Sequence, residues 1–100
     1  MSVQASISDK LAARNPQKAL AKALTLQEQK EHERAFKLFS VAAQAGLTDA
    51  ERELGLYYLS GDGHGLRDPA EGVRWLTRAG EKGDVEAQRT LAGLYMAGFR

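Results

Sequence analysis

Hydrophobic and polar residues follow helical spacing along most of the chain. From residue 50 onward, the apolar positions are spaced i, i+4, i+7 and i+8, which places them on one face of an α-helix. No stretch alternates apolar and polar residues over five or more positions with β-branched enrichment, which is the pattern of a half-buried strand. The pattern therefore predicts an all-α fold of about five helices. The residues on this first helical face are Ala50, Leu54, Tyr57 and Tyr58.

Capping residues and glycines divide this pattern into separate helices. Asn15 and Asp68 are N-cap residues that each precede a proline, and Asp84 is a further N-cap residue. Gly46, Gly61 and Gly83 supply the positive φ that ends a helix at low cost. The first predicted helix starts at residue 15. The other four cover residues 35–45, 48–61, 68–83 and 84–97.

Three boundaries carry additional predictions. Thr48 followed by Glu51 matches a capping box, in which the two side chains bond the free N–H groups of a helix start. "KEHE", residues 30–33, predicts a polar break without glycine between the first two helices. Residues 1–14 are expected to form either a loose tail or one short helix at "SDKLAAR", capped by Ser8.

An internal repeat organises the predicted helices. A shift of 37 residues places "LGLYYLSG" on "LAGLYMAG" and also aligns the segments that precede them. The repeat predicts helical hairpins at about residues 15–45 and 48–82, followed by a half-repeat at 84–98. Matched positions are Leu54 with Leu91, Tyr58 with Tyr95, Gly61 with Gly98, Gly46 with Gly83, Ala50 with Ala87, and Ala35, Phe39 and Ala42 with Gly72, Leu76 and Ala79.

The repeat resembles a known family. The repeat unit contains, in order, an LG-x-x-Y-x-x-G helix, a glycine loop, an acidic residue, a helix with tryptophan and a G-x-x-x-A link. This order is similar to the Sel-one-like repeat, a relative of the tetratricopeptide repeat. The resemblance covers about residues 31–98, although the loop at 61–68 is one residue longer than is typical. The motif residues are Leu54, Gly55, Tyr58, Gly61, Gly63, Asp68, Trp75, Ala79, Gly83 and Ala87, then Leu91, Tyr95 and Gly98.

The resemblance implies a right-handed α-α solenoid of about two and a half antiparallel hairpins that binds a protein or peptide without catalysis. The family's habits also suggest a bacterial adaptor or scaffold. In tetratricopeptide arrays the first helix of each hairpin lines a concave groove, which by analogy assigns partner contacts to one stripe on each of two helices. The alternative for any one of these residues is an ordinary solvated helix face. The stripe residues are Asp49, Arg52, Leu56 and Leu59, then Glu86, Arg89 and Met96.

The last predicted helix has no following helix to cover its apolar residues. Some of its apolar residues would then be left unburied, among Val85, Leu91, Leu94, Tyr95, Met96 and Phe99. Two expectations follow: the chain is a fragment of a longer repeat array, or this end pairs with a second copy as a self-associating structural unit.

Composition narrows the remaining function classes. The chain has 100 residues, 43% hydrophobic and 27% charged, with a net charge of +1 and no cysteine. This excludes thiolate chemistry and fits one folded domain. The chain lacks the clustered Lys and Arg with stacking aromatics that would indicate nucleic-acid binding. It also lacks a segment that resembles a secretory signal or a membrane span. The chain as given is expected in the cytoplasm, or in the periplasm if a leader was removed.

The glycine-rich stretch "GDGHGLRDP" is interpreted as a turn between two helices, in which Gly63 and Gly65 turn the chain. It lacks the lysine of a phosphate loop and the glutamate of a calcium loop. Asp62, His64 and Asp68 remain a less favoured surface metal site. Both His32 and His64 are expected to be solvent-exposed, and no residue spacing indicates an enzyme or a cofactor site.

Overall fold

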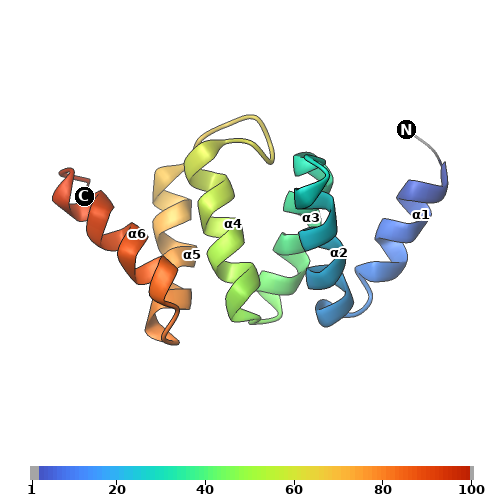
Figure 1. The fold of residues 1–100 in the computed structure, drawn as a ribbon, viewed down its shortest axis with the longest axis horizontal. Helices are drawn as coiled ribbons and strands as arrows, with labels where there is room; N and C mark the ends of the chain where they lie inside the picture. The colour runs from blue at the N-terminus through green and yellow to red at the C-terminus, as the bar shows by residue number, and fades with distance from the viewer. Residues whose placement is uncertain (1–2, 100) are drawn as a thin grey trace.

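The computed structural model describes residues 3–99. Within these residues the chain forms six helices and no strand, and each helix packs mainly on its neighbours in the sequence, as Figure 1 shows. The predicted all-α fold of stacked helical hairpins is confirmed. The helices are α1 (Val3–Ala12), α2 (Pro16–Glu28), α3 (His32–Gln44), α4 (Thr48–Ser60), α5 (Pro69–Glu81) and α6 (Val85–Met96).

The helices pair as α2 with α3 and α4 with α5, and α6 follows without a partner helix after it. Small residues allow the helices to approach, while Phe39, Leu26 and Leu54 fill the space between them. A second, smaller core lies between α4, α5 and α6 and contains Leu76. Burying each large apolar side chain contributes about 1.5–3 kcal/mol, so these positions hold the hairpins together. The buried small residues include Ala19, Ala23, Ala35, Ala42, Ala50, Ala79 and Ala87.

Two glycines set the distance between α4 and α5. A Cβ at Gly55 would lie 2.7 Å from Leu76 Cγ and 3.0 Å from the Gly72 carbonyl oxygen. A Cβ at Gly72 would lie 2.9 Å from the Gly55 oxygen and 3.0 Å from a methyl group of Leu59. Side chains at either position would force the helices apart, because real Cβ atoms do not approach other atoms so closely. Glycine is therefore needed here for close packing, not for a turn.

The predicted N-caps and glycine stops are confirmed. The side chains of Asn15, Asp68 and Asp84 each accept a hydrogen bond from the backbone N–H three residues later, at 3.1, 3.1 and 2.8 Å. Proline occupies the first position of α2 and α5, where its missing N–H costs nothing. Helix ends are followed by glycines with positive φ at Gly46, Gly61, Gly83 and Gly98.

The capping box predicted at the start of α4 is wrong. Leu47 occupies the N-cap position and Thr48 is already helical, with no side-chain bond to the helix start. The Glu51 carboxylate instead lies 3.0 Å from Lys82 Nζ, and Lys82 also donates to the carbonyl of Gly46. Glu51 is 1% exposed, and its ion pair with Lys82 joins α4 to the end of α5 instead of capping its own helix.

Two details of the N-terminal half also differ from expectation. Ser8 does not cap a helix, because α1 begins five residues earlier and Ser8 accepts a hydrogen bond from Lys22 Nζ at 2.7 Å. The polar break without glycine is confirmed, with Lys30 itself in the left-handed region at φ 64°. The helix after this break begins at His32 rather than at Ala35.

The loop over residues 61–68 reaches back to the preceding hairpin. Gly63 was expected to turn the chain, but a Cβ there would lie 2.5 Å from the Cβ of Phe36 on α3, so this glycine serves a close approach. Gly65, at φ 84°, does turn the chain. His64 stacks on Phe36 with ring centroids 4.7 Å apart and meets the edge of Tyr58 at 5.0 Å. The longer loop thus fastens one hairpin to the other.

Over the described residues, every helix is too short and too polar to reach across a bilayer.

Candidate functional site

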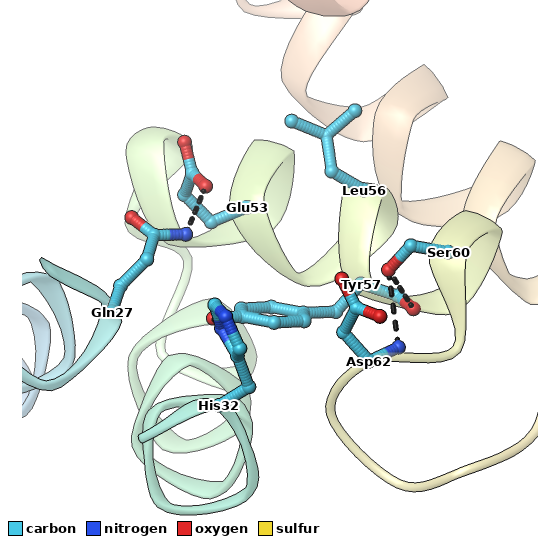
Figure 2. A pocket seen from close by; sticks show the side chains of 7 residues that line it. All are labelled: Gln27, His32, Glu53, Leu56, Tyr57, Ser60 and Asp62. Atoms are coloured by element: carbon cyan, nitrogen blue, oxygen red, sulfur yellow. Dashed lines mark hydrogen bonds between the residues drawn. The ribbon is translucent and has the colours of Figure 1, made fainter. Parts of the chain in front are cut away.

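A cavity of about 350 Å³ lies where α2 and α4, the first helices of the two hairpins, face one another (Figure 2). Most of its wall comes from α4, whose contributing residues are spaced so that they share one helical face. The rest comes from the end of α2, the start of α3 and the loop after α4. The lining residues are Gln27, His32, Glu53, Leu56, Tyr57, Ser60 and Asp62.

The floor of the cavity is a contact between Tyr57 and His32. The Tyr57 hydroxyl lies 2.7 Å from His32 Nδ1, and the two rings meet edge to face with centroids 5.6 Å apart. Burial raises the pKa of Tyr57, and the negative charges of Glu53 and Asp62 add to this effect. The expectation that His32 is solvent-exposed is therefore wrong: it is partly buried because the break after α2 turns it toward α4.

One rim of the cavity is held by a side-chain bridge between the hairpins. Gln27 Nε2 on α2 donates to Glu53 Oε1 on α4 at 2.9 Å (Figure 2). The other carboxylate oxygen of Glu53 accepts from Arg52 Nε at 3.2 Å. At the opposite rim, the Ser60 hydroxyl accepts from the backbone N–H of Asp62 at 3.1 Å, which fixes the first residues of the loop. Both rims are thus positioned by hydrogen bonds.

Next to the rim formed by Gln27 and Glu53, Arg52 lies among four carboxylates. Its guanidinium is within 2.7 Å of Asp84, 3.2 Å of Glu53, 3.3 Å of Asp49 and 3.4 Å of Glu86. Partial burial opposes ionisation of Asp84, but hydrogen bonds from the Ala87 N–H and from Arg52 outweigh it and lower the pKa of Asp84. One cation therefore ties α4 to the start of α6 and leaves an excess of negative charge around it.

The predicted stripe on α4 and α6 divides into three groups. Arg52 brings Asp49 and Glu86 together, and its own side chain is only 18% exposed. Leu56 lines the cavity, whereas Leu59 packs toward Gly72 on α5. The remaining two residues, Arg89 and Met96, are exposed on α6 and stand apart from the cavity.

Most residues that line the cavity lie on the face of α4 adjacent to that stripe. Glu53, Leu56, Tyr57 and Ser60 are spaced i, i+3, i+4 and i+7, a helical face that periodicity alone could have identified. The contribution of His32 had no such signal, because it depends on how the first hairpin packs on the second. The cavity therefore lies on one of the two helices that carry the predicted stripe, on a face next to it.

A second hollow lies beside the loop at the other edge of the hairpin. It has a volume of about 540 Å³ and is lined by Phe36, His64 and residues around them. Asp62 and His64 both contribute to it, while Asp68 is occupied as the N-cap of α5. Across the described part of the chain, no group of three or more His, Cys, Asp or Glu side chains is placed to hold a metal ion.

The family model of the Sel1 repeat matches the chain at residues 27–47 and again at residues 48–84. The first match covers the end of α2 and all of α3, and the second covers α4, the loop and α5. No curated protein and no solved structure matches the chain. The two family matches together span more than half of its residues.

Proposed function

The chain belongs to the Sel1 repeat family, whose repeats generally serve as protein–protein interaction modules, and we propose that it binds a protein partner along the face formed by α2, α4 and α6. The partner lies across this first-helix face as an extended or helical segment, and contacts from successive hairpins add up. The function is scaffolding, without catalysis. The proposed contact residues include Asp49, Arg52, Leu56, Leu59, Glu86, Arg89 and Met96, together with the cavity beside them.

The observation that supports this proposal is the cavity between α2 and α4. It lies between the first helices of two successive repeats, and it combines a partly buried leucine with polar groups already fixed by hydrogen bonds. Preformed concave sites of mixed character are where proteins usually bind their ligands. Preorganisation also lowers the entropy that binding would otherwise cost.

Site-specific photo-crosslinking tests the proposed face. A photoreactive residue is placed at Ser60, which lines the cavity, at Arg89 on α6, or at Arg74 on α5. Arg74 is the matched control because its side chain is 75% exposed but lies outside the cavity. We expect one partner to be crosslinked from Ser60 and Arg89 and not from Arg74. Crosslinking from Arg74 alone would place binding on another face.

A second candidate function is self-association through α6. Val85, Tyr95 and Met96 are large apolar residues exposed on this helix, and an exposed apolar face favours pairing with another surface. In an isologous dimer, the same residues would cover each other. Sedimentation equilibrium across a concentration series tests this: Met96→Lys should abolish dimers, while Lys18→Glu on α2 should not. A wild-type chain that stays monomeric at high micromolar concentration excludes this candidate.

A further inference from the structure

The surroundings of the cavity carry more negative charge than the chain as a whole. Two of its seven lining residues, Glu53 and Asp62, are acids, and no Lys or Arg is among them. Arg52 stands beside the rim, but it is shared among Glu53 and three further carboxylates within 4 Å. A single cation cannot neutralise four carboxylates, so the rim attracts positive charge even though the whole chain has a net charge of +1.

Asp62 is the acid whose charge remains available. None of the ion pairs formed within the described residues involves it, and its side chain is exposed at the mouth of the cavity. Its backbone N–H is bonded to Ser60, so the first turn of the loop holds the residue in place. Asp62 and Glu53 both line the cavity, and Figure 2 shows them on either side of Tyr57.

The cavity also has an apolar part. Leu56 is half-buried on its wall and the Tyr57 ring forms its floor (Figure 2). A lysine or arginine side chain matches both parts, because a three- or four-carbon stem packs on apolar surface while its cationic head stays among polar groups. A leucine or methionine would fill the apolar part and add no positive charge beside Glu53 and Asp62. A glutamate would meet like charge.

We propose that the cavity between α2 and α4 holds an arginine or lysine side chain of the partner, with its stem against Leu56 and Tyr57 and its head at Glu53 and Asp62. This inference rests on the proposed function, because it specifies what the first-helix face recognises. It identifies the partner by chemistry as a segment with a basic anchor residue. An arginine offers planar paired donors to a carboxylate, so it is expected to bind at least as well as lysine.

Peptide pools with one fixed residue test the proposal. Four pools of nine-residue peptides are randomised except at the centre, which is arginine, lysine, leucine or glutamate, and binding to the full chain is measured by fluorescence anisotropy. A photoreactive residue at Ser60 reports whether bound peptide lies at the cavity. We expect the arginine and lysine pools to bind about tenfold more tightly than the leucine pool, with the glutamate pool weakest.

The outcomes separate this inference from the proposed function. If the leucine pool binds best and crosslinks at Ser60, the face binds peptides but the basic anchor is wrong. If the pools bind without crosslinking at Ser60, or if none binds, both the anchor and the proposed face are contradicted.

Isosteric variants locate the charge. Asp62→Asn should weaken the arginine pool several-fold, and Glu53→Gln should do the same, whereas Glu81→Gln on α5 removes the same charge outside the cavity and should leave binding unchanged. Asp62 lies on a loop and is exposed, so its variant keeps the fold even if Glu53→Gln disturbs Arg52. Unchanged binding by Asp62→Asn, with folding verified by circular dichroism, would overturn the proposal.

Discussion

Helices α4 and α6 occupy the same position in successive repeats, 37 residues apart, yet they differ sharply in burial. On α4, Leu54 is buried and Tyr58 is partly buried. At the matching positions of α6, Leu91 is only partly buried and Tyr95 is 56% exposed. Helix α4 is packed between α3 and α5, whereas α6 packs mainly on α5 and meets α4 only at its start.

The difference between these helices comes from their neighbours rather than from their own sequences. In a repeat array each unit contacts only adjacent units, so stability is approximately a sum of local and nearest-neighbour contributions. Helix α6 therefore relies on the small core at Leu76 and on the link from Arg52 to Asp84. Disturbing α4 should unfold the whole array, whereas disturbing α6 should affect mainly that end.

The largest expected effect comes from placing the same side chain at glycines on the two helices. Gly55→Val should lower the free energy of unfolding by about 3 kcal/mol, because its side chain would overlap Leu76 and the backbone of Gly72. Gly93→Val is the matched control on α6, since no atom apart from its chain neighbours and the backbone of its own helix lies within 4 Å of a Cβ there, and it should change stability by less than about 0.5 kcal/mol. Urea denaturation measures both. Equal losses would show that neighbours do not determine the difference.

The next effect concerns the link between the two helices. Arg52→Met keeps the aliphatic stem but leaves Asp84, whose side chain is 8% exposed, without its cation; we expect a loss of about 1.5–3 kcal/mol. Arg74→Met removes an exposed pair with Glu71 at 3.7 Å and should cost less than about 1 kcal/mol. Thermal unfolding followed by circular dichroism distinguishes them. Similar melting temperatures for the two variants would contradict a structural role of Arg52.

A smaller and local effect should appear without any mutation. Amides of α6 should exchange with solvent at least tenfold faster than those of α4, because fewer buried contacts have to break for α6 to open. Native-state hydrogen exchange measured by mass spectrometry or NMR tests this. In Arg52→Met the exchange of α6 should accelerate further while α2 remains protected. Uniform protection across α4 and α6 would instead indicate that the array opens as one unit.

Much of this fold could be predicted from the sequence, because its signals are local. Helical spacing, the caps at Asn15, Asp68 and Asp84, and the glycine stops all act within a few residues of the chain. The capping box at Thr48 is wrong because Leu47 occupies the N-cap position and Glu51 pairs with a distant lysine, Lys82. A local pattern cannot show that a side chain has a better partner on another helix.

The candidate site was less predictable for the same reason. The analogy with tetratricopeptide repeats indicated the first helices, and α4 does supply most of the cavity. Its floor, however, depends on His32, which reaches Tyr57 across 25 positions of the chain. Gly63 likewise looked like a turn residue and proved to be a contact with Phe36. Both features result from how the two hairpins stack, and the hydrophobic periodicity of the sequence does not predict that stacking.

The smallest predicted effect concerns how the stability of the two ends of the array depends on pH, since each end is fastened by an arginine–aspartate pair. Arg34 holds Asp9 of α1 through two hydrogen bonds of 2.9 and 3.0 Å, and these lower the pKa of Asp9. The pKa of Asp84 is lowered as well. A lowered pKa in the folded state adds stability that is complete above the ordinary carboxyl pKa of about 3.9 and is lost as the pH falls through the lowered value.

The free energy of unfolding should therefore fall with decreasing pH below about 4, and Asp9→Asn and Asp84→Asn should each flatten that slope. The two changes should add, because the pairs join α1 to α3 and α4 to α6 and share no residue. Urea denaturation of the two single variants and the double variant at a series of pH values below 5 measures this. If either single variant kept the wild-type slope, its carboxylate would not be ionised preferentially in the folded chain. Loss of the additivity would mean that the two ends communicate through the hairpins between them, contrary to a purely nearest-neighbour array.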